Sequence, residues 1–325
     1  MKAVVCKEFG PPEQLVVEQL EDPRPAAGQL LVDVAAAAVT FPDTLMLEDK
    51  YQYKAQPPYV PGGEVTGVVT ALGDEGVEGW SVGDRVAGGF GTIGGFAELA
   101  SVPAASARRL PDSVDFDVAA GLNYAYGTSL YGLRDRGHLQ PGETLLVLGA
   151  GGAVGLSAVE LGRLLGARVI AAASSDDKLD LCRQHGADEV IDYSTEDLKN
   201  RAKELTGGQG VDVVYDCVGG QRAEQALRAI AWEGRFLVIG FTAGIPSIPL
   251  NLTLLKSCAI VGVFYGAMSA RDPALSRSIS EELLDLVASG ALRPHVSGRY
   301  PLERAGEALR ALMDRTVIGK VVVTP

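Results

Sequence analysis

The chain has 325 residues, more than a single compact core usually contains, so its length predicts two domains. A composition of 47% hydrophobic and 22% charged residues is typical of a folded globular protein and excludes a largely disordered one. Asp and Glu outnumber Lys and Arg by 41 to 29, and no basic stripe offsets the net charge of −12, so nucleic acid is not expected as a partner. The apolar stretches are too short to cross a bilayer and residues 1–10 lack a secretory signal pattern, so we expect a cytoplasmic protein with no membrane partner.

The first 120 residues show a pattern of short strands separated by Pro and Gly clusters, such as Pro61-Gly62-Gly63. The predicted strands are Lys2–Cys6, Leu30–Ala37, Val65–Val69 and Arg85–Ala87. A helical pattern first appears at Phe116–Leu122 and the residues after it. This part of the chain is therefore predicted to be mostly β-structure.

From about Pro141 the pattern changes to apolar strands alternating with helices, which favours a parallel sheet covered on both faces. The predicted strands are Thr144–Leu148, Arg168–Ala173, Glu189–Tyr193, Val211–Val218, Phe236–Ile239 and Ile260–Val263. The predicted helices are Val154–Leu165, Asp176–His185, one that runs to Leu205 from a capping box formed by Ser194 and Asp197, and Ala223–Ala231. About six strands in this alternation indicate an α/β fold with a doubly wound sheet.

The tail contains two predicted helices, Ala274–Gly290 and Leu302–Asp314, and a closing strand, Lys320–Val323. We expect the tail to fold back onto the N-terminal domain, with a cleft at the junction of the two domains. The expected division is residues 1–122 for the N-terminal part of a catalytic domain, 123–265 for the nucleotide domain and 266–325 for the returning segment. The helix Ala274–Gly290 could instead be a further layer of the nucleotide domain.

The turn Gly149-Ala150-Gly151-Gly152-Ala153-Val154-Gly155 follows a strand and opens a helix, the context that a dinucleotide-binding turn requires. In such turns Gly152 would let the backbone approach the pyrophosphate, and Gly155 would allow close packing of the helix on the strand. The helix N-terminus supplies N–H donors and a partial positive charge. A tight turn in another α/β fold is the alternative interpretation.

The end of the second strand predicts which dinucleotide binds. Enzymes that use NAD usually carry Asp or Glu there, to bind the ribose hydroxyls. Here Ala173 takes that place, Ser174 follows, and Lys178 lies in the first turn of the next helix, which leaves room and positive charge for a 2′-phosphate. Asp176 and Asp177 add nearby negative charge but can point away as first-turn residues. NADPH is therefore favoured over NADH.

With these residues assembled, the chain resembles the zinc-free quinone oxidoreductase (zeta-crystallin-type) branch of the medium-chain dehydrogenase/reductase superfamily over essentially its whole length. The motifs that carry the resemblance are Val39-Thr40-Phe41-Pro42-Asp43, Pro58-Tyr59-Val60-Pro61-Gly62, Gly83-Asp84-Arg85-Val86, the glycine turn and Gly319-Lys320-Val321. The resemblance implies a GroES-like β-barrel catalytic domain built from both ends of the chain, a Rossmann domain, and NADPH as the cofactor.

Zinc-dependent alcohol dehydrogenases share this architecture, but at the segment corresponding to Gly62-Gly63-Glu64 they have a His ligand in the middle position. The four cysteines are far apart in the sequence, and the only histidines are His138, His185 and His295. A catalytic zinc needs about three protein ligands, so no metal site is expected. A quinone or an enone is already electrophilic and can accept hydride without a Lewis acid.

The resemblance also implies site residues by position. Catalytic candidates that would contact the acceptor or the nicotinamide are Thr40, Asp43, Tyr51, Tyr59 and Thr128. Cofactor-binding candidates are Gly151, Gly152, Ala153, Val154, Gly155, Ser174, Lys178, Tyr193, Phe241, Val263, Phe264 and Tyr265. Thr40 stands where many relatives have Asn. Ordinary core packing is an equal alternative for Phe241 and Phe264.

The leading hypothesis is NADPH-dependent reduction of a small-molecule quinone, with an enone, enal or enoyl thioester as the alternative acceptor. A crystallin-like structural or regulatory protein that binds NADPH is a non-enzymatic alternative. The glycine-dense segment Gly88–Gly95 lacks the Lys-Ser/Thr ending of a phosphate loop and is expected to border the substrate cleft. The apolar segment Ala259–Val263, the last strand of the sheet, predicts a homodimer paired through that edge.

Overall fold

The computed structural model describes residues 1–89 and 93–325, and in it the chain divides into two compact units. The first unit combines Met1–Tyr124 with Ser280–Pro325, and the second, which we call the nucleotide unit, is the continuous stretch Ala125–Ile279. The second unit therefore extends beyond the predicted limit at residue 265, and the chain returns to the first unit within a helix. In the described ranges no helix is both long enough and apolar enough to cross a membrane.

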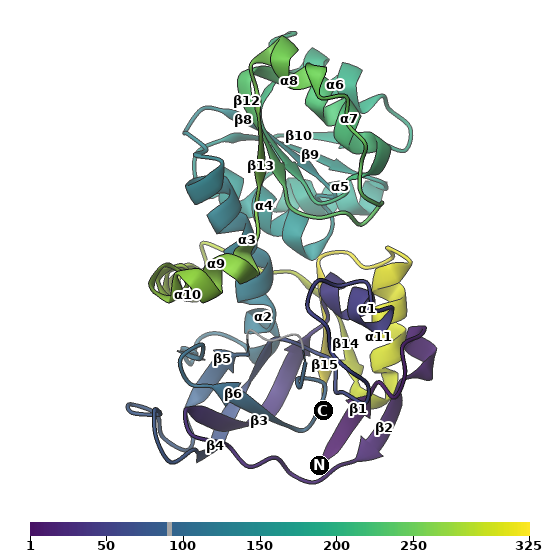
Figure 1. Cartoon of the computed structure of the whole chain (residues 1–325). Helices are drawn as coiled ribbons and strands as arrows, with labels where there is room; N and C mark the ends of the chain where they lie inside the picture. Colours follow the sequence, from purple (N-terminus) through teal and green to yellow (C-terminus); the bar gives the residue numbers. More distant parts are fainter. Residues whose placement is uncertain (90–92) are drawn as a thin grey trace. The chain divides into compact units, whose positions relative to one another are not determined.

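The first unit is built mainly from antiparallel strands (Figure 1). A seven-stranded sheet has the order β14-β15-β3-β4-β5-β7 with β6 paired to β3, and a separate ribbon pairs β1 with β2. The strands are β1 (Lys2–Val5), β2 (Val16–Gln19), β3 (Gln29–Ala38), β4 (Val65–Leu72), β5 (Arg85–Gly88), β6 (Leu99–Pro103), β7 (Arg108–Arg109), β14 (Val296–Pro301) and β15 (Lys320–Thr324). The short helices are η1 (Pro12–Gln14), α1 (Phe41–Leu47), α2 (Phe116–Ala119), η4 (Leu302–Arg304) and α11 (Ala305–Met313).

The core of the first unit follows from the alternation of side chains along its central strand, β3. Leu30, Val32 and Val34 are buried on one face, as period-two patterning requires. The returning tail contributes to the same core through Leu309 of α11 and Val323 of β15. Val323 of β15 lies opposite Ala37 of β3, so the two ends of the chain share one sheet.

A buried pair of opposite charges holds the segment that leaves the first unit. The Glu64 carboxylate accepts the backbone N–H of Asn123 at 3.0 Å and that of Tyr124 at 2.9 Å. The Lys320 ammonium donates to the carbonyls of Val118 at 2.5 Å and Ala120 at 2.6 Å. Burial raises the pKa of Glu64 to about 7 and lowers the pKa of Lys320 to about 8. The two side chains together satisfy four backbone groups that no regular helix would pair.

The nucleotide unit is a parallel six-stranded sheet in the order β10-β9-β8-β11-β12-β13. Its strands are β8 (Thr144–Leu148), β9 (Arg168–Ala173), β10 (Glu189–Asp192), β11 (Val211–Asp216), β12 (Ile230–Val238) and β13 (Ala259–Gly262). Its helices are α3 (Thr128–Leu130), α4 (Ala153–Leu164), α5 (Asp176–Gln184), α6 (Leu198–Leu205), α7 (Gly220–Arg228), α8 (Asn251–Lys256), α9 (Tyr265–Arg271) and the start of α10 (Pro273–Ala288), with π-helical turns η2 (Asn123–Gly127) and η3 (Tyr131–Arg136) beside α3. This strand order is that of a doubly wound dinucleotide-binding sheet, and it confirms the predicted fold class.

Helices cover both faces of this sheet, with α4 and α5 on one face and α6, α7 and α8 on the other (Figure 1). One apolar cluster lies between the sheet and the helices of the second face. In it, Leu198, Ala226 and Leu252 of the three helices pack against Ile170 and Phe236 of the strands. From β8 the chain adds β9 and β10 on one side of the sheet and then β11, β12 and β13 on the other, so the topological switch point lies between β8 and β11. The carboxyl ends of these two strands flank the crevice where such folds bind ligands.

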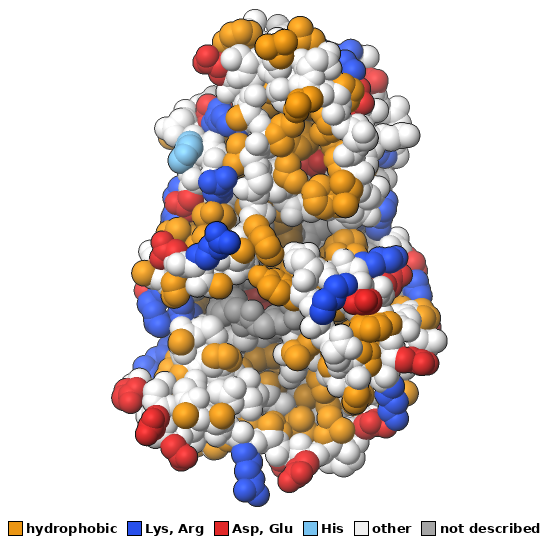
Figure 2. All heavy atoms as spheres, in the orientation of Figure 1, with side chains coloured by type: hydrophobic (Ala, Val, Ile, Leu, Met, Phe, Trp, Pro, Cys, Tyr) orange, Lys and Arg blue, Asp and Glu red, His pale blue; other side chains and the backbone are white. Residues whose placement is uncertain are grey.

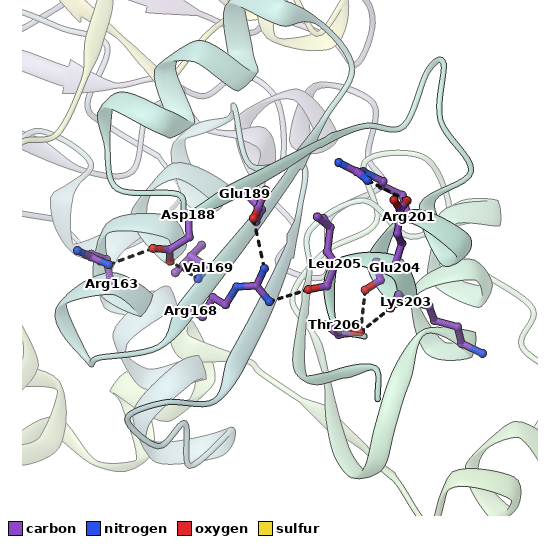
Figure 3. Close-up of polar contacts among 11 residues, drawn as sticks. Arg163, Arg168, Val169, Asp188, Glu189, Arg201, Lys203, Glu204, Leu205 and Thr206 are labelled. Atoms are coloured by element: carbon purple, nitrogen blue, oxygen red, sulfur yellow. Dashed lines mark hydrogen bonds and ion pairs between the residues drawn. The ribbon is translucent and has the colours of Figure 1, made fainter. Parts of the chain in front are cut away.

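Polar contacts fasten the opposite, amino-terminal edge of the sheet (Figure 3). Arg168, which begins β9, donates to the Leu205 carbonyl at the end of α6 at 2.8 Å and lies 3.4 Å from the Glu189 carboxylate at the start of β10. Asp188 accepts from Arg163 of α4 at 3.1 Å. These partly exposed pairs add little stability individually but fix the strand ends to the helices. The glycine turn and the residues around it lie at the carboxyl edge of the sheet.

Three predicted boundaries were wrong for identifiable reasons. Asp197 itself caps α6 by accepting from the Asn200 N–H at 2.7 Å, while the Ser194 hydroxyl binds Asp192, so there is no capping box between Ser194 and Asp197. The helical pattern expected from Phe116 through Leu122 and the residues after it is interrupted after Ala119, because Gly121 adopts a φ of +76°, and helical turns resume at Asn123.

The third boundary concerns the end of α7. The helix expected at Ala223–Ala231 is Gly220–Arg228, and Ile230 already belongs to β12, where it pairs with Val211. Alanine fits a helix and a buried strand equally well by size, so the sequence pattern could not locate this transition.

Candidate functional site

The glycine turn connects β8 to α4 at the carboxyl edge of the sheet. Gly149 has a φ of +68°, and Gly152 is the N-cap residue whose carbonyl accepts the Leu156 N–H at 2.8 Å. A Cβ added at Gly155 would lie 2.2 Å from the Gly149 carbonyl oxygen, so only glycine allows the helix to start this close to the strand. The helix N-terminus therefore lies directly behind the turn, with its free N–H groups at that end.

Gly151 and Gly152 are glycines for different reasons. A Cβ at Gly151 would fall 2.6 Å from Cβ of Lys178, so the protein itself fills that space. A Cβ at Gly152 would meet no atom closer than the Gly149 carbonyl oxygen at 3.7 Å, an ordinary contact. No packing constraint within the described chain demands glycine at 152, and the space beside its backbone is open to a ligand. This open position next to a helix N-terminus fits the pyrophosphate of a dinucleotide.

The end of β9 carries no acidic side chain. Ala173 is buried, Ser174 is exposed, and Ser175 is the N-cap of α5 without a side-chain capping bond. Asp176 and Asp177 are both exposed in the first turn of α5. The stem of Lys178 lies across Gly151, so the glycine turn and the start of α5 form one surface. A 2′-phosphate at this position would meet hydroxyls and one ammonium group.

Tyr193 follows β10 and lies beside the end of β9, because its N–H donates to the Ala173 carbonyl at 3.1 Å. The guanidinium of Arg222, in the first turn of α7, lies 4.0 Å from the centre of the Tyr193 ring. Sequence analysis did not single out Arg222, since a lone Arg in a helical pattern gives no signal. Only the strand order brings the start of α7 near the end of β10.

The candidates for the nicotinamide end gather near the end of β13. A Cβ at Gly127 would lie 2.7–2.8 Å from the Tyr265 ring, which explains the glycine before Thr128 and brings the Thr128 segment and Tyr265 together. The Tyr265 ring also lies 6.1 Å from the Tyr131 ring. The Val263 N–H donates to the Val238 carbonyl at 3.1 Å. Phe241 and Phe264 are 42% and 46% exposed, so neither is a core residue in this chain.

A buried carboxylate organises the candidates of the first unit. Asp43 Oδ2 accepts from the Thr40 N–H at 2.7 Å and from the Thr40 hydroxyl at 2.6 Å, and Oδ1 accepts from the Gly62 N–H at 3.2 Å. Thr40, which stands where many relatives have Asn, therefore binds the Asp43 carboxylate through both its backbone and its side chain. Burial raises the pKa of Asp43 to about 6, although the three hydrogen bonds oppose that rise. Asp43 joins the start of α1 to the turn at Gly62.

Tyrosines lie on the same part of the first unit. Burial raises the pKa of Tyr51 to about 12, with smaller contributions from Tyr53 and the Asp43 charge. Burial, the Cys6 thiol and the charges of Asp43 and Asp49 raise the pKa of Tyr59 well above its usual value. The Tyr51 and Tyr53 rings are 5.9 Å apart, and Tyr53 is 47% exposed. Tyr51 and Tyr59 therefore remain protonated hydroxyl donors throughout the neutral range.

Two sequence expectations concern metals and loops. Among the described residues, no three His, Cys, Asp or Glu side chains are grouped where they could hold a metal ion. His185 instead lies 2.9 Å from Glu160, which also accepts from Tyr126, so this histidine belongs to a buried polar network. The expected loop Gly88–Gly95 falls partly outside the described residues, and its role stays a prediction.

Comparison with known proteins bears on both units. Residues 26–112 match the family model for the alcohol dehydrogenase GroES-like domain, and residues 153–289 match that for zinc-binding dehydrogenase. A quinone oxidoreductase-like protein 2 homolog from Nematostella vectensis is 40% identical over 99% of this chain and 88% of its own length. A quinone oxidoreductase from Pseudomonas aeruginosa is 33% identical over 100% of this chain and 99% of its own.

Solved structures agree with these relatives. Escherichia coli quinone oxidoreductase complexed with NADPH has a TM-score of 0.92 at 29% identity and covers 100% of both chains. A mycobacterial protein complexed with NADPH has a TM-score of 0.93 at 33% identity, again over 100% of both chains. The first unit is therefore the GroES-like domain and the second the Rossmann domain of a known architecture. The chain belongs to the quinone oxidoreductase family of the medium-chain dehydrogenase/reductase superfamily.

Proposed function

We propose that this oxidoreductase transfers hydride from NADPH to a quinone without a metal ion. The observation that carries the proposal is the glycine turn: the protein fills the Cβ positions of Gly151 and Gly155 but leaves the one at Gly152 open. The absence of an acidic side chain at Ala173, together with the position of Lys178, favours the 2′-phosphorylated dinucleotide. Two relatives of the same architecture were solved with NADPH.

The nucleotide unit would bind and orient the cofactor, which supplies the hydride. The N–H groups of Ala153 and Val154, at the free end of α4, would bind the pyrophosphate. Ser174 and Lys178 would bind the 2′-phosphate, and Tyr193 would border the adenosine. The remaining candidates would surround the nicotinamide and exclude water from it: Thr128, Phe241, Val263, Phe264 and Tyr265.

The first unit would act on the acceptor. A quinone is electrophilic enough to accept hydride once it is positioned, so the residues need to orient it and stabilise the negative charge that develops on its oxygen. Tyr51 and Tyr59 can donate hydrogen bonds for that purpose, because their raised pKa values keep both hydroxyls protonated. Asp43 and Thr40 hold each other and the Gly62 turn, which fixes the tyrosine-bearing segment.

The test is NADPH oxidation measured against a panel of quinones and enones of matched size, with NADH as the second cofactor and a strong zinc chelator in a parallel series. We expect quinone-dependent turnover with NADPH that is unchanged by the chelator. A clear preference for enones would assign the alternative acceptor. NADPH binding without turnover on any acceptor would point to the crystallin-like role, and loss of activity with the chelator would overturn the metal-free proposal.

We also propose that the chain forms a homodimer through the edge of its nucleotide sheet. β13 is the end strand of the sheet order, and Ile260 on it is 41% exposed. Ile245, Leu254 and Leu255, in and before α8, are 82%, 80% and 64% exposed. Figure 2 shows hydrophobic side chains gathered on the end of the nucleotide unit where Figure 1 places α8. An apolar surface beside an open strand edge is suited to a second copy of the chain.

A further inference from the structure

Arg222 is a cation that the function proposed above does not use. It lies in the first turn of α7, which begins at Gly220 after the turn Val218-Gly219. Its side chain is half-buried, and in the described part of the chain the guanidinium makes no hydrogen bond or ion pair. It lies over the Tyr193 ring, whose centre is 4.0 Å from the guanidinium carbon, and its charge also acts on the Asp192 carboxylate. A guanidinium has five N–H donors and usually pairs them with a carboxylate or a phosphate.

The position of the Tyr193 ring places this cation at the carboxyl edge of the sheet. The Tyr193 N–H binds the Ala173 carbonyl, so the residue lies directly beside the strand end that discriminates between a ribose hydroxyl and a 2′-phosphate. Lys178 approaches the same strand end from α5, on the other face of the sheet. Arg222 approaches from α7, on the face where Tyr193 packs against the apolar cluster.

Acidic groups around this edge would oppose the binding of a phosphate, so a second cation would be needed to offset them. Asp176 and Asp177 are exposed in the first turn of α5, and Asp192 ends β10. The pKa of Asp192 lies below its usual range, chiefly because the Ser194 hydroxyl and N–H donate to it, with a contribution from the Arg222 charge. Carboxylates therefore outnumber the single lysine at this edge, and a dianionic 2′-phosphate would meet a local field that one lysine does not neutralise.

We propose that Arg222 is a specificity-determining residue that binds the 2′-phosphate of NADPH, and that Tyr193 positions its guanidinium by stacking. The inference rests on the proposed function, since it assigns a residue to the same dinucleotide site. The planar guanidinium can donate two parallel hydrogen bonds to phosphate while its face stays on the ring. With the ring 4.0 Å away, no purine base fits between the two groups, so the adenine must lie elsewhere and the cation's free edge is left for an anion.

The test measures equilibrium binding of NADPH and NADH, and of the fragments 2′,5′-ADP and 5′-AMP, which differ only in the 2′-phosphate. We expect Arg222→Gln to weaken NADPH and 2′,5′-ADP roughly tenfold or more and to change NADH and 5′-AMP less than about twofold. Arg228→Gln is the matched control, because Arg228 lies on the same helix but pairs with Glu224 at 2.6 Å. Equal losses for both members of each pair would show that Arg222 contacts the adenosine instead and would overturn the proposal.

Two further variants test the role of the ring. Tyr193→Phe keeps the stacking face and should retain the preference for 2′,5′-ADP, whereas Tyr193→Leu should lose part of it with Arg222 intact. A Tyr193→Leu protein with full preference would overturn the positioning role. The wild-type protein and Lys178→Ala separate the two levels of the argument. If the wild type binds neither dinucleotide, the proposed function fails. If Lys178→Ala weakens NADPH much more than NADH while Arg222→Gln weakens both equally, only this inference fails.

Discussion

The side chain of Lys178 lies across the backbone of Gly151, so that a Cβ at position 151 would be 2.6 Å from Cβ and 2.7 Å from Cγ of the lysine. The turn that would bind the pyrophosphate and the helix that would bind the 2′-phosphate are therefore in direct contact. This contact holds the stem of the lysine against the turn.

Lys178→Ala should weaken NADPH binding by roughly tenfold while changing NADH binding by less than about twofold, because the proposed partner of the ammonium group is the 2′-phosphate, which NADH lacks. Dissociation constants for the two dinucleotides, measured by quenching of protein fluorescence, give the comparison. Lys199→Ala, at a partly exposed position of α6, is a control for the loss of one positive charge. Similar losses for NADPH and NADH would remove Lys178 from the 2′-phosphate site.

Gly152→Ala and Gly155→Ala should have opposite effects on binding and on stability. The added methyl group at 152 meets no close atom of the chain, so the free energy of unfolding should change by less than about 1 kcal/mol, while affinity for both dinucleotides falls tenfold or more. The methyl group at 155 meets the Gly149 carbonyl oxygen at 2.2 Å and should destabilise the fold by about 1–3 kcal/mol. Chemical denaturation and cofactor titration measure the two effects. A destabilised Gly152→Ala protein with normal affinity would contradict the proposed pyrophosphate position.

Tyr51→Phe and Tyr59→Phe should each lower kcat for quinone reduction by roughly tenfold to a hundredfold, because each removes a donor to the developing oxyanion. Tyr53→Phe, at the exposed neighbour of Tyr51, should leave kcat within about twofold. Steady-state kinetics at saturating NADPH separate kcat from KM. Unchanged kcat in both of the first two variants would show that the tyrosines only shape the pocket.

Stability should depend on pH through the buried carboxyl group of Glu64. Its folded-state pKa of about 7 lies above the ordinary value of 4.5, so the folded state binds the proton more tightly and the free energy of unfolding falls as pH rises from 4.5 to 7. Asp43, with a pKa of about 6, adds a fall of the same sign at lower pH. Glu64→Gln should flatten the curve between pH 6 and 7.5 in urea denaturation. An unaltered slope in the variant would assign the effect to another group.

The dimer edge makes a prediction about mass in solution. Leu254→Lys combined with Ile260→Lys should convert a dimer of the wild-type chain to a monomer in light scattering, because the charges would be buried at the proposed edge. Val82→Lys, at a 64% exposed valine of the first unit, is the matched control and should remain dimeric. A wild-type mass equal to one chain would end the proposal.

The parallel sheet and the glycine turn were predictable because their signals are local. Strand β9 matches the predicted range Arg168–Ala173, and the close approach of helix and strand at Gly155 is the one that its position in the motif indicated. The contact between Thr40 and Asp43 was not predicted, although the spacing between a helix N-cap and the third helical residue could have indicated it. Periodicity and short spacings therefore gave most of the fold and part of the candidate site.

The sequence could not reveal contacts between residues that are far apart in the chain. Glu64 and Lys320 lie in separate motifs, and nothing in either motif indicates that both hold the segment 118–124. Arg222 meets Tyr193 only because α6 and α7 pack on the same face of the sheet. Such contacts depend on topology, and a single sequence without related sequences contains no record of them.

The pairing of β15 with β3 has a consequence for how the protein is made. The nucleotide unit is one continuous stretch, so all of its strands have been synthesised once Ile279 has left the ribosome. The first sheet lacks an inner strand until Lys320–Thr324 emerges and occupies the place beside Ala37 and Ala38. Until then the end of β3 at Ala37 and Ala38 lacks its neighbour, although all of the nucleotide unit has been synthesised. The first unit can therefore be completed only when synthesis of the chain is almost finished.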